Sequence, residues 1–188
     1  MSSKVNILSI LGGHLNTLSN VDGSWSWADV FTFIVVPVAF AIAGVGVGFN
    51  LNKDVSSLLV NFGAIFTALL LSVLVLVYDQ ESKLDDKEVL YKERKMAGDS
   101  LYGAKKKFLE QLYFNISYSI ISSLVLIGVC FFHSVIDGFS NAGMQNENSG
   151  ALMVAKYVLT PAAVIVSLNL MLTIMMIVKR LHSLLTLR

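Results

Sequence analysis

The charges of this chain are gathered in one segment, and this segregation limits what the chain can fold into. Asp79–Gln111 holds 16 of the 27 charged side chains among 188 residues, eight basic and eight acidic. The regions on both sides are apolar, so that 55% of all residues are hydrophobic and only 14% are charged. An average globular domain has about 25% charged residues. The sequence therefore predicts a membrane protein with two apolar halves joined by a charged connector.

Four apolar runs are long enough to cross a membrane as helices. The first, Val30–Phe49, has 20 uncharged residues, which as a helix span about 30 Å of hydrocarbon. The others are Ser57–Tyr78, Leu112 to about Ile136, and about Ala151 to Val178. The turn between the first two runs is short, which predicts an antiparallel hairpin. The predicted fold class is an all-α membrane protein, with four transmembrane helices arranged as two hairpins joined by a charged cytoplasmic connector.

Five parts of the chain follow from this division. They are an amino-terminal cytoplasmic or interfacial segment (1–27), a first transmembrane hairpin (28–78), the connector (79–111), a second transmembrane hairpin (112–178) and a cytoplasmic tail (179–188).

Basic residues predict the orientation of the spans. The amino-terminal segment, the connector and the tail together carry 12 lysines and arginines, whereas the opposite side carries only Lys53 and Lys156. Cytoplasmic loops carry the excess of basic residues in membrane proteins. We therefore expect a multi-pass protein of the cell inner membrane with both termini in the cytoplasm.

The amino-terminal segment has a helical pattern. Apolar residues recur at spacings of three and four, at Val5, Leu8, Leu11, Leu15 and Leu18. The pattern predicts a short amphipathic helix in the membrane interface, with outward-facing side chains at Lys4, Asn6, His14 and Asn16. The alternative is a frayed terminus, because Gly12 and Gly13 each weaken a helix by about 1 kcal/mol. The sequence leaves both open.

Small residues in the first span predict close helix packing. Gly44 and Gly48 are four apart, and such a pair lets another helix backbone approach closely. Together with the small size of the chain, this favours a homo-oligomer. A phosphate-binding loop is excluded, because these glycines lie inside an apolar run rather than between a strand and a helix. Pro37 predicts a kink in the same span.

Polar residues recur along the other spans and predict a polar membrane seam. Its candidates are Asn61, Asn115, Ser119, Ser122, Asn169 and Thr173. One interpretation is a water-lined path or an oligomer interface. The alternative is structural, since serine and threonine bond to their own helix carbonyls and asparagines hold helices together at about 1 kcal/mol each. An asparagine in lipid needs a partner, so Asn61 and Asn169 are expected to face protein.

The connector is acidic in its first half and basic in its second. Lys105, Lys106 and Lys107 lie just before the third span, where anionic headgroups attract a lysine by about 1 kcal/mol. Gly98-Asp99-Ser100 resembles a break followed by a helix cap, so one helix is expected from about Leu101 into the membrane. Apolar residues among the charges suggest a docking surface for a soluble cytoplasmic partner. The alternative is an ordinary solvated loop.

Candidates for catalysis or metal binding are few. His133 and Asp137 share a helix face and could relay protons, but contact with water at the far interface is the favoured interpretation, since no third partner is near in sequence. The three histidines are scattered and Cys130 is the single cysteine, so we expect no metal, no cofactor and no enzymatic activity. A net charge of +1 gives no reason to expect direct nucleic-acid binding.

The order of these segments resembles that of small multi-span inner-membrane effector proteins of bacterial anti-phage defence, in particular the transmembrane proteins encoded beside retron reverse transcriptases. The resemblance lies in Phe31–Pro37, Phe62–Phe66 and Leu69–Asp79, under a third of the chain. It implies a toxin held silent by a cytoplasmic complex, which perturbs the membrane on infection and halts the infected cell (abortive infection). The alternatives are a non-toxic membrane anchor that recruits a soluble partner and, less favoured, a small transporter.

Overall fold

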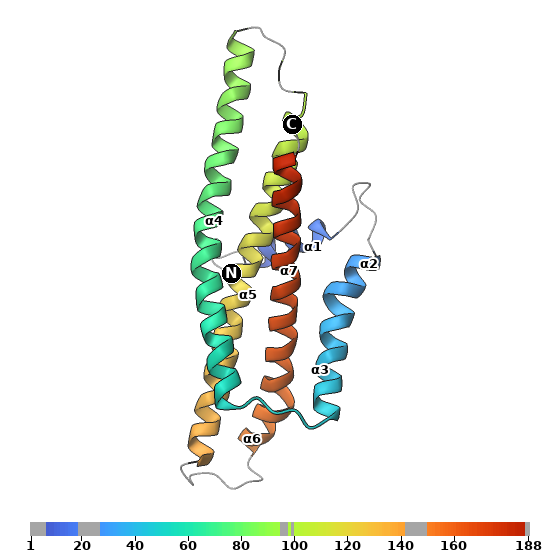
Figure 1. Ribbon diagram of the computed structural model, residues 1–188, viewed down its shortest axis with the longest axis vertical. Coiled ribbons are helices and arrows are strands. Elements are labelled where there is room, and N and C mark those ends of the chain that lie inside the picture. The colour runs from blue at the N-terminus through green and yellow to red at the C-terminus, as the bar shows by residue number, and fades with distance from the viewer. Residues whose placement is uncertain (1–6, 19–26, 95–97, 99, 142–149, 187–188) are drawn as a thin grey trace.

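The computed structural model describes residues 7–18, 27–94, 98, 100–141 and 150–186, and every secondary-structure element among them is helical. Figure 1 shows a long bundle in which two helices extend beyond the others at one end. The elements are α1 (Ile7–Thr17), α2 (Trp27–Val30), η1 (Phe31–Val35), α3 (Val36–Gly46), α4 (Lys53–Glu93), α5 (Tyr102–Asn141), α6 (Gly150–Val154), η2 (Ala155–Leu159) and α7 (Thr160–Thr186). The elements η1 and η2 are short stretches of π-helix.

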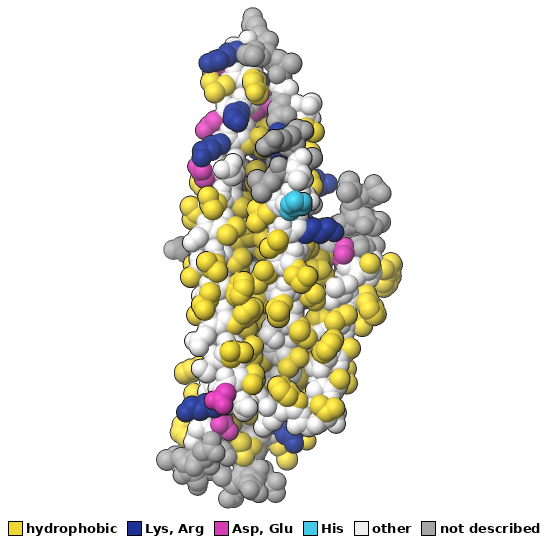
Figure 2. Space-filling model, in the orientation of Figure 1, with side chains coloured by type: hydrophobic (Ala, Val, Ile, Leu, Met, Phe, Trp, Pro, Cys, Tyr) yellow, Lys and Arg dark blue, Asp and Glu magenta, His cyan; other side chains and the backbone are white. Residues whose placement is uncertain are grey.

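Four helices are long and apolar enough to cross a membrane, which confirms the predicted class. They are Trp27–Gly46, Lys53–Glu93, Tyr102–Phe139 and Gly150–Leu184, with mean hydropathies of 2.2 to 2.5 in their most apolar windows. Figure 2 shows hydrophobic side chains over the middle of one face and charged side chains mainly near its upper end. The chain is therefore a multi-pass membrane protein by length and composition.

The two helices of the first predicted hairpin scarcely pack against each other, whereas α5 and α7 of the second do. Helix α4 packs against α5, α5 against α7, and α7 against α3. Helix α3 runs antiparallel to α4 after a short turn, but it lies on the other side of α7 and scarcely touches α4 (Figure 1). The connection between the first two spans was thus predicted correctly, but their pairing was not, because a short turn sets direction and leaves the packing partner to side-chain fit.

The connector forms two helical extensions rather than a loop. Helix α4 continues to Glu93 and α5 begins at Tyr102, so the prediction of a helix from about Leu101 into the membrane is confirmed. Gly98 and Ser100 lie between the helices, whereas Asp99 lies outside the described residues. We call the end of the bundle formed by residues 79–111 the charged end.

Apolar packing forms two clusters along the bundle. Near the charged end, α4, α5 and α7 bury Leu70, Val77, Leu109, Leu112, Ile116 and Ile177. Toward the opposite end, a second cluster contains Leu51, Leu126, Cys130, Ala163 and Leu170. Lipid tails are as apolar as leucine, so fit between side chains, rather than escape from water, favours these contacts within the membrane.

The close approach of two helices occurs at Gly63, which the sequence analysis did not single out. A Cβ there would lie 3.0 Å from the Ile127 side chain and 3.2 Å from the Ser123 carbonyl oxygen. The Thr67 hydroxyl, one turn later, lies 2.6 Å from the Ser123 hydroxyl. Small residues four apart therefore do bring helices together here, but on α4 against α5.

The predicted glycine pair of the first span is not a pair on one helix face. Helix α3 ends at Gly46, and Gly48 has a φ of 73°, in the left-handed region that favours glycine. Gly48 thus serves the turn into α4, while Gly44 stays in α3 next to Phe49. Because the helix ends before Gly48, Gly44 and Gly48 do not share a helix face, and the prediction that they do is wrong.

Candidate functional site

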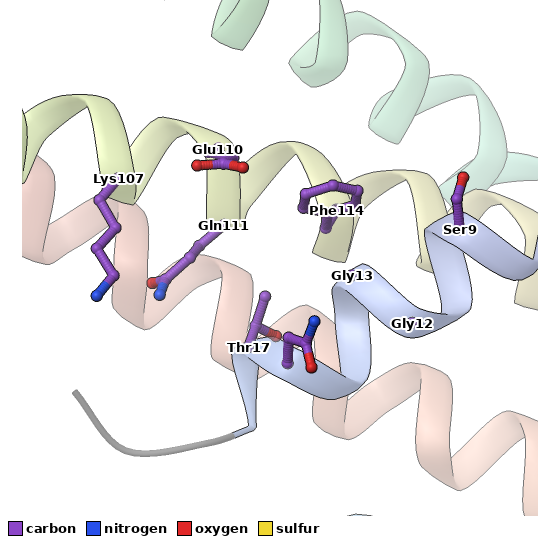
Figure 3. A pocket seen from close by; sticks show the side chains of 9 residues that line it. Ser9, Gly12, Gly13, Thr17, Lys107, Glu110, Gln111 and Phe114 are labelled. Atoms are coloured by element: carbon purple, nitrogen blue, oxygen red, sulfur yellow. The ribbon is translucent and has the colours of Figure 1, made fainter. Parts of the chain in front are cut away.

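Helix α1 runs across the bundle and packs on α5 near the charged end. Gly13 makes this contact possible, because a Cβ at this position would overlap the Phe114 ring. Figure 3 shows Phe114 of α5 facing Gly13, with Gln111 one turn away near Thr17. The amphipathic helix is present, but its inner face differs from the prediction: Leu8 and Leu15 are exposed, and Lys4, Val5 and Asn6 lie outside the described residues.

The inner face of α1 carries His14, which had been expected to face outward. The ring is 3% exposed, and its Nδ1 lies 2.8 Å from the Asn115 side-chain oxygen. It stacks on the Tyr118 ring with 3.8 Å between the ring centres and 3° between the planes. The Thr17 hydroxyl lies 2.7 Å from the same Asn115 oxygen. Polar atoms, rather than the leucine stripe, therefore fix the docking of α1.

A second branch of the network joins α5 to two further elements, α7 and η1. The Tyr118 hydroxyl donates to the Asn169 side-chain oxygen at 2.7 Å, and the Asn169 amide nitrogen donates to the Phe33 carbonyl oxygen at 2.9 Å. That carbonyl lies four residues before Pro37, which has no N–H to offer it. Asn169 thus supplies the donor that the proline removes, as tertiary contacts commonly do for membrane prolines.

Arg180 links the carboxyl end of α1 to α5 and α7. Its guanidinium donates to the Gln111 side-chain oxygen at 2.9 Å and to the Thr17 carbonyl oxygen at 2.7 Å. The last carbonyls of a helix have no partner inside the helix and carry partial negative charge, so a cation there stabilises the helix end. Arg180 therefore caps α1 and ties it to the bundle.

A cavity adjoins the network at Thr17 and Gln111. It has a volume of about 510 Å³ and lies between α1 and α5, lined by Ser9, Gly12, Gly13, Asn16, Thr17, Lys107, Glu110, Gln111 and Phe114 (Figure 3). Asn115 is fully buried, and among the described residues its amide nitrogen has no hydrogen-bond partner. A buried donor without a partner costs about 1 to 3 kcal/mol, so the docked network is incompletely satisfied.

His14 is held mainly in its neutral form. Burial lowers its pKa from the ordinary value of 6.5, and the positive charge of Arg180 lowers it further, while the hydrogen bond to Asn115 opposes both. Helix α1 lies outside the four helices that are long and apolar enough to cross a membrane. The site holds α1 on the bundle mainly through hydrogen bonds and ring stacking.

The predicted polar seam exists in part. Asn115, Ser119 and Thr173 are fully buried, Ser122 is 8% exposed, and Asn169 is half-buried with the partners given above. Ser119 and Thr173 donate to the carbonyls of Asn115 and Asn169, each four residues earlier, as the structural interpretation expected. Asn61 is the exception: it is exposed on α4, so the protein that it was expected to face would have to be another copy or another chain, and that expectation stays a prediction.

The three lysines predicted to bind lipid headgroups, Lys105, Lys106 and Lys107, have different surroundings. Lys106 donates to both carboxylate oxygens of Asp85 at 2.8 and 2.9 Å, and the Tyr102 hydroxyl donates to Asp85 at 2.6 Å. Lys106 thus joins α4 to α5 rather than reaching lipid, which corrects that assignment. Lys105 lines a groove between α4, α5 and α7, and Lys107 lines the cavity under α1.

At the opposite end, His133 and Asp137 line a second cavity of about 440 Å³ with Lys53, Ser56 and Ser134. His133 is 3% exposed, so a simple position in water does not describe it. The Ser56 hydroxyl lies 3.1 Å from that of Ser134 and 3.2 Å from the Cys130 carbonyl oxygen. The proton relay stays a prediction.

The sequence analysis missed the roles of Thr17, Tyr118 and Arg180. Tyr118 lies among the serines of the third span, and its position one turn after Asn115 could have placed it in the seam. Arg180 falls in the predicted cytoplasmic tail (179–188). Its contact with Thr17, 163 residues away in the chain, has no local signal.

Comparisons with known proteins add no relative: no family model, no curated protein and no solved structure matches the chain.

Proposed function

We propose that the protein is a membrane effector of a bacterial anti-phage defence system, which on activation perturbs the integrity of the inner membrane and halts the infected cell. The observation that carries the proposal is the docking of α1 over a buried polar network through His14 and Asn115, at 2.8 Å. The defence context is supported by the resemblance in Phe31–Pro37, Phe62–Phe66 and Leu69–Asp79.

Release of α1 supplies the physical step. Without α1, the Asn115 oxygen loses His14 and Thr17, and the Thr17 carbonyl leaves Arg180. Each polar group left unpaired at membrane depth costs several kcal/mol. Water or the polar side chains of another copy would lower that cost. The exposed network therefore favours an oligomer with a wet interior, which is what a permeable state requires.

The orientation proposed for this effector puts both termini and the charged end in the cytoplasm. Its support is the excess of 12 basic residues over two. Helix α1 and the cavity beneath it then face the compartment from which an infection signal or a soluble defence partner arrives. A labelled cysteine on the α4 extension that reacts only from outside the cell would overturn this orientation.

The test is to induce the chain alone in a bacterial host and follow membrane potential with a voltage-sensitive dye. Wild type is compared with Gly13→Ala, which places a methyl group against Phe114. We expect both proteins to lower the membrane potential, and Gly13→Ala to lower it at least as much as wild type does. Unchanged potential in both proteins, at equal amounts in the inner membrane, would contradict it.

A second candidate is a membrane anchor that recruits a soluble partner through the charged end. The observation favouring it is that the α4 and α5 extensions are joined by Asp85, Tyr102 and Lys106, while Val89 and Leu90 stay about half exposed (53% and 47%) beyond the apolar span. Exposed apolar residues on a braced helical pair suit a protein contact. Retention of one specific soluble protein without loss of potential would favour the anchor. A small transporter has less support, since the two prolines lie in the first and the fourth spans and the polar positions of the two halves differ.

A further inference from the structure

A groove lies where α4, α5 and α7 meet at the base of the charged end. It has a volume of about 470 Å³ and combines two kinds of lining. Three lysines come from two helices, Lys83 and Lys87 of α4 and Lys105 of α5. The floor is apolar and includes Leu84, Leu109 and Leu181. Among the described residues that line it, none is an aspartate or a glutamate.

We propose that this groove binds one anionic phospholipid, with the phosphate held by the three lysines and the glycerol and upper acyl chain lying on the leucines. This inference does not depend on the proposed function. An amphiphile is the occupant that matches both linings, because a soluble anion leaves the leucines uncovered and a neutral lipid has no net negative charge to complement the three lysines.

The depth of the groove supports a lipid. Leu76 lies within the second apolar run and Tyr78 ends it. Lys83 is five residues further, about 7.5 Å along a helix, and the headgroup layer is about 5 to 8 Å thick on each side of the hydrocarbon. Lysine side chains also extend along apolar surface to place the ammonium at the headgroups. Lys83 thus lies at the boundary at which a phosphate lies, while Lys87, one turn further along α4, lines the same groove on its aqueous side.

The neighbouring charges favour this groove over the cavity under α1. The Lys83 ammonium has one carboxylate partner, Asp79 at 2.6 Å, in an exposed pair, which competes weakly with a phosphate. Asp85 is occupied by Lys106, at 2.8 Å. The cavity under α1 contains Glu110 beside Lys107, so its lining is mixed in charge and less suited to an anion.

The experiment measures lipid retention by native mass spectrometry on the purified full chain in detergent. The variant K83Q/K87Q/K105Q is compared with K53Q/K92Q/K156Q, which removes the same charge outside the groove. Wild type and both variants are incubated with dioleoyl phosphatidylglycerol or with dioleoyl phosphatidylcholine. Inorganic phosphate is then added as a soluble competitor of the bound lipid.

We expect wild type to retain one phosphatidylglycerol in preference to phosphatidylcholine. The groove variant should lose affinity by about tenfold or more, and the control by about twofold or less. Equal retention of the two lipids, equal losses in the two variants, or displacement of the lipid by phosphate at similar concentration would each overturn the proposal. Glutamine resembles lysine in its aliphatic stem but carries no charge. A groove variant that stays monodisperse and helical shows that the loss of affinity does not come from unfolding.

Discussion

The Asn169 amide nitrogen on α7 lies 2.9 Å from the Phe33 carbonyl oxygen on η1, four residues before Pro37. A proline leaves this carbonyl without its helical donor, and the π-helical turn Phe31–Val35 marks where the helix adjusts. One side chain from 136 positions away therefore completes the backbone of the first span. The same residue accepts from Tyr118, so the break in the first span and the dock for α1 are connected.

The two membrane asparagines should respond oppositely to removal. Asn169→Leu loses a donor to Phe33 and an acceptor for Tyr118, and should lower the free energy of unfolding by about 1 to 2 kcal/mol. Asn61→Leu replaces an exposed polar group on α4 and should leave the monomer unchanged or stabilise it. Unfolding in detergent followed by circular dichroism compares them. Equal destabilisation would mean that Asn61 has a partner within the chain.

Gly13 and Gly12 form a matched pair for the docking of α1. A methyl group on Gly13 overlaps the Phe114 ring, whereas a Cβ on Gly12 meets nothing within 4 Å. Gly13→Ala should weaken docking by about 1 to 3 kcal/mol, while Gly12→Ala should leave it equal or slightly stronger through helix propensity. Hydrogen–deuterium exchange over residues 7–17 reports the difference. Slow exchange in both variants would show that the Phe114 side chain moves aside without weakening the docking of α1.

A double-mutant cycle measures the bond between His14 and Asn115. We expect a coupling free energy of about 0.6 to 2 kcal/mol between His14→Phe and Asn115→Leu, the range for polar pairs between membrane helices. His182→Phe with Asn115→Leu is the control, because His182 is exposed on α7. Coupling as large for His182 as for His14 would indicate a general loss of packing rather than a specific bond.

Acid should release α1. The folded pKa of His14 lies below its ordinary value of 6.5 because the ring is buried and Arg180 is near. The undocked histidine therefore takes up a proton first, and docking is fully stable above about pH 6.5 and weakens as the pH falls below that value. The midpoint of thermal unfolding should fall between pH 8 and pH 5.5 in wild type, and fall less in His14→Gln. Identical pH profiles would exclude His14 as the titrating group.

Of the two glycines predicted to mediate self-association through the first span, only Gly44 lies in helix α3. A Cβ on Gly44 would lie 3.8 Å from that of Phe49, an ordinary contact, so the monomer tolerates a small side chain there. Gly44→Leu should therefore reduce oligomer size in detergent if α3 is the interface. Gly48→Leu instead strains a left-handed residue by about 1 to 2 kcal/mol and should lower stability. An unchanged oligomer in Gly44→Leu would place the interface elsewhere.

What the sequence alone determined is the layout along the chain. The four spans, the connector and the helix entering the third span were predictable, because hydropathy and charge are properties of local runs and a run of about 20 apolar residues has few alternatives to a membrane helix. The amphipathic start was also visible as a periodicity.

Only the tertiary structure decided which side chains meet. It turned His14 inward and Asn61 outward, moved Lys106 from lipid to Asp85, ended α3 before Gly48, and put α4 against α5. Each of these outcomes depends on a partner distant in sequence, such as Asn115 for His14, 101 positions away. A polar side chain in a membrane takes whichever partner the packing brings within reach, and no local pattern contains that partner.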